Sequence, residues 1–232
     1  MIPLTGSTEI RELVFPIMDV PEKDQPAKLI GTGFFIGKRG FAVTAAHVID
    51  QMDPEIAYAG FVDKNTYGFI GEKINFFEKH PTEDVALIHL PNRPQESSFR
   101  ISSTKEIASC DYNIWGYPME VAQELLKNPI SPDAPKYERP DLIYSKGHVR
   151  RLISRELPFH IYRGSYFYEL SAIAGDGCSG GPMVSLRNIK PPIDNVVGVY
   201  IGAQNKDGLA VRTERIASWV PELLGRSLRE ET

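Results

Sequence analysis

The stretch Gly177-Cys178-Ser179-Gly180-Gly181-Pro182 places one serine among three glycines. Glycine tolerates backbone conformations that other residues avoid, so this stretch can form a tight loop whose consecutive amide N–H groups face one point. Acyl transfer needs such donors where negative charge develops on the attacked carbonyl oxygen. We predict that the amides of Gly177 and Ser179 are these donors. A plain glycine-rich turn between two strands is the alternative interpretation.

A serine hydroxyl is a weak nucleophile and needs an imidazole to take its proton and a carboxylate to orient that imidazole. His47 lies among small residues in Thr44-Ala45-Ala46-His47-Val48. Asp84 directly precedes the apolar run 85–88. These residues follow one another along the chain in the order His, Asp, Ser, and we take His47, Asp84 and Ser179 as the candidate catalytic residues.

Two neighbours compete for these roles. Glu83 could replace Asp84, but we prefer Asp84 because it adjoins the buried run and successive side chains alternate faces along a strand. Cys178 could replace Ser179, since thiolates are strong nucleophiles. The remaining histidines are expected to be ordinary structural residues; they are His80, His89, His148 and His160.

Composition excludes several classes of protein. Of the 232 residues, 42% are apolar and 24% are charged, which is typical of a globular chain and not of a disordered one. The net charge of −4 offers no general attraction to nucleic acid, so we do not expect nucleic acid as a partner. Only two cysteines are present, Cys110 and Cys178, and neither has metal-ligand spacing. We expect no disulfide framework, no metal and no cofactor.

Short strands separated by glycine and proline turns predict an all-β fold in two sets of about six strands. The predicted strands cover residues 10–18, 28–36, 41–44, 57–62, 67–70, 73–77 and 84–90 in the first set and 112–117, 142–153, 159–173, 181–186 and 196–203 in the second, with a loop over 120–139. The polar, proline-containing stretch Pro91–Glu106 suggests a boundary near residue 97, hence domains 1–97 and 98–232. The segment Gly31–Gly37 resembles a dinucleotide-binding loop only superficially, because no helix follows it, and we interpret it as strand. Apolar residues at helical spacing predict a C-terminal helix over Arg215–Leu224, kinked or restarted at Pro221.

Taken together, TAAHV (44–48), DVALI (84–88) and GCSGGP (177–182) resemble the trypsin/chymotrypsin superfamily of serine proteases. GTGFFIG (31–37), WGYP (115–118) and GVYIGAQ (198–204) are similar to its disulfide-free bacterial branch, including the protease domain of high-temperature-requirement proteases without their extra peptide-binding domains. The resemblance covers most of the chain. Its pattern has a glycine directly after the nucleophile, which implies Ser179, followed by Gly180, rather than Cys178. It implies two six-stranded antiparallel β-barrels of the chymotrypsin type, with peptide-bond hydrolysis by a serine endopeptidase through an acyl-enzyme intermediate.

The resemblance also implies a substrate pocket. Its floor would contain Ile173, and its walls would contain Gly202, Ala203 and Gly208, all uncharged. We therefore expect an apolar side chain in the substrate just before the scissile bond. Secreted members carry an aspartate before the serine that pairs with a newly cut N-terminus; here Cys178 stands there, so we expect no activation of that kind.

Two other functions remain open at this point. A non-catalytic interaction module could use the barrels for binding, with the basic stretch Ser145–Arg163 as its contact surface, although a solvated barrel face is the simpler interpretation of that stretch. An effector protease could be held inactive by a regulatory protein partner. The partners we expect are a protein or peptide substrate and no membrane, since the sequence lacks a long apolar run and a signal-like start. We expect a cytoplasmic protein, with the periplasm or secretion left open.

Overall fold

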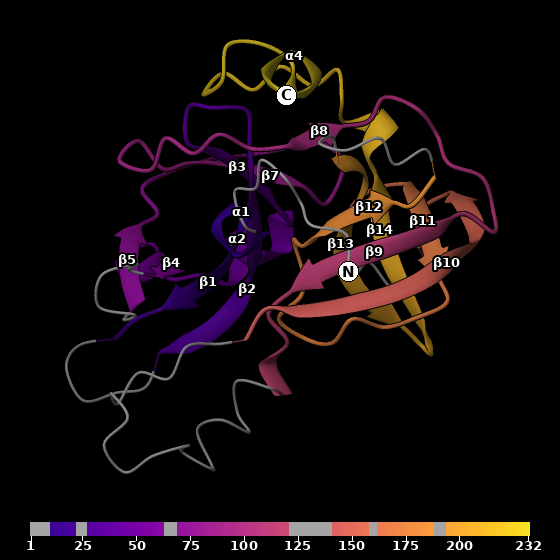
Figure 1. The fold of residues 1–232 in the computed structure, drawn as a ribbon, viewed down its shortest axis with the longest axis horizontal. Helices are drawn as coiled ribbons and strands as arrows, with labels where there is room; N and C mark the ends of the chain where they lie inside the picture. The colour runs from indigo at the N-terminus through magenta and orange to yellow at the C-terminus, as the bar shows by residue number, and fades with distance from the viewer. Residues whose placement is uncertain (1–9, 22–26, 63–68, 121–140, 158–161, 188–193) are drawn as a thin grey trace.

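The computed structural model describes residues 10–21, 27–62, 69–120, 141–157, 162–187 and 194–232. Its strands form two seven-stranded sheets that lie next to each other, the first from the N-terminal half and the second mainly from the C-terminal half (Figure 1). The described helices are short and lie outside the sheets (Figure 1). Among the described residues, no helix has both the length and the apolar character needed to cross a membrane.

The first sheet has the strand order β5-β4-β1-β2-β3-β7-β6, with all neighbours antiparallel. Its strands are β1 (Val14–Asp19), β2 (Lys28–Ile36), β3 (Phe41–Thr44), β4 (Ala57–Val62), β5 (Phe69–Lys73), β6 (Phe76–Lys79) and β7 (Ala86–His89). Every residue of β1 and β3 is buried, so both faces of these strands are covered. A one-turn helix, α1 (Ile10–Leu13), leads into β1, and α2 (Ala46–Gln51) follows β3.

The second sheet has the order β12-β9-β10-β11-β14-β13-β8. Its strands are β8 (Phe99–Ile101), β9 (Asp111–Gly116), β10 (Ile143–Ser154), β11 (Tyr166–Leu170), β12 (Pro182–Ser185), β13 (Asp194–Gln204) and β14 (Asp207–Arg212). An additional pairing between β12 and β13 closes six of these strands into a barrel. The seventh, β8, adds to β13 as a parallel strand. The described part of the first sheet shows no such closing pair and forms a half-barrel.

This arrangement confirms the predicted chymotrypsin-type double-barrel fold, and several strands have the predicted bounds. Lys28–Ile36, Phe41–Thr44 and Ala57–Val62 are strands as expected, so the glycine-rich segment from Gly31 lies mainly within β2. Strand β14 was missed, and β8 lies inside the stretch expected to be a linker. The loop expected at 120–139 falls almost wholly outside the described residues.

The C-terminal helix lies elsewhere than predicted. Over 215–224 the chain forms separate turns after a short 3₁₀ helix, η1 (Thr213–Arg215), and the only helix after it is α4 (Leu228–Glu231) among the residues described. Pro221 has no amide hydrogen to donate to a preceding turn, which favours a break there. Ile216 and Leu224 are still buried, whereas Val220 is 58% exposed, so the expected apolar stripe packs only in part.

The two sheets are joined by buried contacts. Phe34 of β2 and Phe99 of β8 meet edge to face, with ring centroids 5.6 Å apart, and neither is accessible to solvent. The Tyr117 hydroxyl, after β9, donates to the Val14 carbonyl of β1 at 3.0 Å. The chain ends near the first sheet, where Arg39 forms an ion pair with Glu231 at 2.5 Å. The two halves therefore share part of one core.

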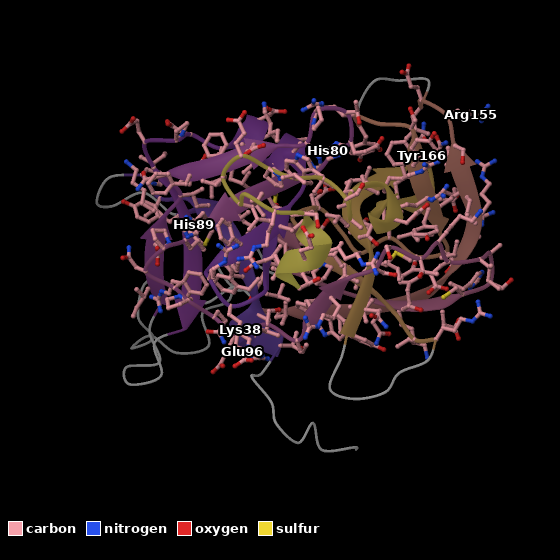
Figure 2. All side chains as sticks on the ribbon, turned by 90° about the horizontal axis from the view of Figure 1, so that it is seen from above. Lys38, His80, His89, Glu96, Arg155 and Tyr166 are labelled. Atoms are coloured by element: carbon pink, nitrogen blue, oxygen red, sulfur yellow. The ribbon has the colours of Figure 1, made fainter. Side chains whose placement is uncertain are left out.

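Residues 145–154 of the basic stretch belong to β10, where most of the side chains are exposed or partly exposed. Arg151 forms an ion pair with Glu169 at 2.6 Å, and Arg150 pairs with Asp207. Figure 2 shows Arg155 at the rim of the second barrel, whereas His80 lies between the two halves in that view. The carboxylates of Glu169 and Asp207 thus offset part of the positive charge of this stretch, which is typical of a solvent-exposed barrel face.

Candidate active site

Asp84 and His47 form a two-point contact at one end of the first sheet. The Asp84 carboxylate has no solvent exposure; its Oδ2 lies 2.8 Å from His47 Nδ1, and its Oδ1 accepts the His47 backbone N–H at 2.9 Å. The chain brings them together because β3 pairs with β7 up to Thr44 and Ala86, just before α2 and just after Asp84. A carboxylate at Nδ1 keeps the proton there and leaves Nε2 free to accept one.

Glu83 points away from this pair. Its side chain is buried and accepts the Ser165 backbone N–H of the second barrel at 3.3 Å. Burial raises the pKa of the Glu83 carboxyl, and hydrogen bonds from the backbone of Ser165 and Tyr166 oppose this shift. The structure therefore brings Asp84 to His47 and uses Glu83 to join the two barrels.

The serine loop docks on the first sheet through Thr32 of β2. The Thr32 N–H donates to the Ser179 carbonyl, and its hydroxyl donates to the Gly177 carbonyl, both at 2.8 Å. A Cβ at Gly180 would lie 2.1 Å from the Thr32 carbonyl oxygen and 3.0 Å from the Ala45 nitrogen. Only glycine allows the serine loop to come this close to Thr32 and Ala45. The close contact places Ser179 beside the segment that leads into His47.

The Ser179 hydroxyl donates to the Ile201 carbonyl of β13 at 3.2 Å. Within the described residues, no hydrogen bond joins this hydroxyl to His47. The His47 side chain is 19% exposed, so its ring is open to a reactant on one side. The structure thus places the serine loop beside the segment that leads into His47, with the Ser179 hydroxyl turned toward β13.

The amides of Gly177 and Ser179 have no acceptor among the described groups. The intervening Cys178 N–H donates to the Gly175 carbonyl at 3.3 Å, and the following Gly180 N–H donates to the Tyr200 carbonyl at 2.7 Å. Gly177 has φ +88°, a conformation that favours glycine. The loop geometry therefore leaves these two amides available to an anionic oxygen.

Cys178 is buried beneath the loop. Its thiol donates to the Ala174 carbonyl at 3.1 Å, and its side chain packs against Gly116, where an added Cβ would lie 2.8 Å from Sγ. Burial, with Glu120 and Asp176 nearby, raises the pKa of this thiol to about 12. A thiol that stays protonated at neutral pH is a poor nucleophile, which favours Ser179.

The described part of the chain shows no cluster of histidine, cysteine or acidic side chains suited to a metal ion.

The predicted pocket residues gather at the β13–β14 end of the second barrel. Ala203 pairs with Gly208, and a Cβ on Gly208 would lie 2.4 Å from the Ala172 carbonyl, next to Ile173. Ile173 is 45% exposed. Gly202 has φ +129° and faces the hydroxyl of Tyr162.

Sequence reasoning missed two residues at this site. Thr32 holds the serine loop, and its position between Gly31 and Gly33 in a strand was the available signal. Tyr162 lies over His47, with ring centroids 5.7 Å apart and ring planes at 58°. No sequence signal identified Tyr162, because it reaches the site from the connection between β10 and β11.

The sequence from residue 31 to residue 190 matches the family model described as a trypsin-like peptidase domain. The chain belongs to this family. It is a trypsin-like serine protease and thus a hydrolase, so protein or peptide is its class of substrate. None of the curated proteins matches the sequence significantly.

Solved structures of proteases share the fold at low sequence identity. The apo protease domain of MamO from Magnetospirillum magneticum is 14% identical, with a TM-score of 0.67 over 93% of this chain and 99% of that one. The active form of the Rv3671c protease from M. tuberculosis is 19% identical, with a TM-score of 0.64 over 94% and 82%. Neuropsin from mouse brain is 17% identical, with a TM-score of 0.59 over 95% of both chains.

Proposed function

We propose that this trypsin-like protease is a serine endopeptidase in which Ser179 attacks the substrate carbonyl. His47 takes the hydroxyl proton at Nε2, and Asp84 holds the imidazole and stabilises its charged form. The observation that carries the proposal is the buried Asp84 bound to both the backbone and the ring of His47, beside the docked serine loop. The Ser179 hydroxyl must first rotate from the Ile201 carbonyl toward the imidazole.

The negative oxygen of the tetrahedral intermediate is stabilised by the Gly177 and Ser179 amides in this proposal. Loss of one such donor typically raises the barrier by about 2.7–4 kcal/mol. The intermediate collapses to an acyl-enzyme with release of the amine, which takes the proton from His47. Water, activated by His47, then releases the acid and regenerates Ser179.

A fluorophosphonate probe tests the nucleophile directly, because it forms a covalent bond with an activated serine. We expect labelling of the wild type, loss of labelling in Ser179→Ala, and retained labelling in Cys178→Ala as the control. Mass spectrometry of the labelled peptide identifies the residue. Failure of the folded wild type to label would contradict the proposal and favour a non-catalytic interaction module.

The preference for an apolar residue before the scissile bond is also a proposal. Its support is the uncharged set around the expected pocket, namely Ile173, Gly202, Ala203 and Gly208. Burial of an apolar side chain is worth about 1.5–3 kcal/mol, enough for a preference but not for one unique protein target. Cleavage of a mixed peptide library, read by mass spectrometry, tests it. A preference for lysine or arginine at this position would contradict it.

A further inference from the structure

One edge of β13 is unpaired next to the candidate nucleophile. Over Gly202–Gln204 this strand pairs with β14 on one edge, with a register shift at Ile201, and β12 pairs with β13 only up to Val199. No other described strand covers the second edge there. Exposed strand edges bind extended peptides through main-chain hydrogen bonds. An extended substrate would therefore add to β13 as a further strand.

The two carbonyl groups that such a peptide would use are Ile201 O and Ala203 O. Each accepts a side-chain hydroxyl, Ile201 O that of Ser179 and Ala203 O that of Tyr162, so both can be reached from the side of the candidate active site. Ile201 O accepts the Ser179 hydroxyl, and it therefore lies beside the residue that precedes the scissile bond. In an antiparallel peptide, the residue two positions further toward the N-terminus would then meet Ala203 O.

Tyr162 already binds the second of these acceptors. Its hydroxyl donates to the Ala203 carbonyl at 3.2 Å, and burial raises the pKa of this hydroxyl, so that it remains a donor at neutral pH. A Cβ added to Gly202 would lie 2.3 Å from the same hydroxyl oxygen. The phenol thus fits against a glycine in β13, while its ring contacts His47.

Residues next to Tyr162 attach it to the first barrel. The Arg163 guanidinium donates to the Pro81 carbonyl at 3.1 Å and to the His80 carbonyl at 3.4 Å. The Ser165 N–H donates to Glu83 at 3.3 Å. These contacts lie on the loop that presents Asp84. Tyr162 is consequently held between the two barrels rather than extended into solvent.

We propose that Tyr162 is a specificity-determining residue that competes with the substrate backbone for the Ala203 carbonyl. The inference rests on the proposed peptidase function. The Tyr162 hydroxyl already binds the Ala203 carbonyl. A peptide with three residues before the scissile bond must therefore compete with this hydroxyl for the hydrogen bond to Ala203, and it gains less binding energy from that bond. The site therefore favours substrates that make few main-chain contacts on the acyl side.

The test compares two substrates in each enzyme. Both are coumarylamides that carry the residue preferred in the library profile directly before the scissile bond. In the short substrate this residue is acetylated at its amine. In the long substrate two alanines precede it. Tyr162→Phe removes the competing hydroxyl and keeps the ring. We expect the ratio of kcat/KM for the long substrate to that for the short one to rise about 3- to 10-fold, the value of one hydrogen bond.

Two further variants accompany this measurement. Tyr144→Phe is the matched control, because Tyr144 is 52% exposed on β10 and its hydroxyl binds Asn113; we expect the wild-type ratio. Arg163→Gln weakens the attachment of Tyr162 by a separate route and should raise the ratio in the same direction. If thermal unfolding shows that Tyr162→Phe does not fold, Arg163→Gln still tests the inference.

The outcomes separate the inference from the function on which it rests. Suppose that the wild type labels with fluorophosphonate and cleaves both substrates, and that the ratio of the two kcat/KM values is the same in wild type, Tyr162→Phe and Arg163→Gln. This result overturns the role of Tyr162 and leaves the proposed function intact. A folded wild type that neither labels nor cleaves overturns the proposed function, and the inference with it. A ratio that rises in the two variants and not in Tyr144→Phe supports the inference.

Discussion

At the scale of single residues, Thr32 connects the two halves of the site. Its hydroxyl donates to the Gly177 carbonyl at 2.8 Å and accepts the Tyr117 N–H at 3.1 Å, and all three groups are buried. One side chain of the first sheet thus satisfies two backbone groups of the second barrel. Because buried polar groups without a partner are costly, this small contact sets where the serine loop lies.

Thr32→Val tests this contact with little change in shape. The variant removes the hydroxyl that donates to the Gly177 carbonyl and accepts from the Tyr117 amide, so we expect a loss of about 1–3 kcal/mol in the free energy of unfolding. Chemical denaturation measures this loss. We also expect slower fluorophosphonate labelling. Thr32→Ser, which retains the hydroxyl, should stay close to the wild type, and equal stability of the Val and Ser variants would contradict this assignment.

At the scale of elements, the loop between β6 and β7 positions Asp84 and depends on His80. The buried His80 ring accepts the backbone N–H groups of Thr82 and Glu83 at 3.2 and 3.0 Å, and it packs edge to face on Trp219. These bonds use the neutral ring. Burial, with a smaller contribution from the Arg163 charge, lowers the pKa of His80 to about 4.

This pKa predicts an acid-sensitive loop. Between about pH 6.5 and 4 the unfolded chain binds a proton at His80 that the folded chain excludes, so the free energy of unfolding falls as the pH falls. The loss attributable to His80 at pH 5 is about 2 kcal/mol. In His80→Asn an amide oxygen replaces the ring nitrogen as acceptor but does not titrate. Unfolding curves at pH 7 and 5 should therefore converge in this variant, and an unchanged pH dependence would contradict the prediction.

At the scale of the whole molecule, the two sheets share core contacts, so we expect them to unfold together. Phe99, from the second sheet, is fully buried against Phe34 of the first. The candidate side chains come from both sides of this contact, with His47 and Asp84 in the first half and Ser179 in the second. A site of this kind depends on how the halves are docked.

Phe99→Ala should weaken that docking. Truncation of a buried phenylalanine typically costs about 3–5 kcal/mol, through lost burial and the cavity left behind. We expect a loss of this size in chemical denaturation, with one cooperative transition retained. Ile107→Ala is the control, because Ile107 is 54% exposed and should change stability by less than about 0.5 kcal/mol. Two separate transitions in the wild type would contradict a shared core.

Much of the fold could be predicted from local patterns. Alternation and turn residues predicted β2, β3 and β4 with their bounds. The patterns failed where long-range pairing decides the structure: β8 is three residues long and exists because it adds to β13. The stretch 215–224 has helical spacing, but separate, partly exposed turns around Pro221 replaced the helix.

The sequence by itself identified the family and its fold, because TAAHV, DVALI and GCSGGP, in this order along the chain, resemble the motifs of trypsin-like proteases. The tertiary structure decided what lies next to them. Only the tertiary structure shows that Asp84 rather than Glu83 contacts His47, that Thr32 holds the serine loop, and that the Tyr162 hydroxyl binds Ala203. These contacts join residues that are far apart in the chain. Local sequence patterns do not determine which distant residues meet, because that depends on how the strands pair and pack.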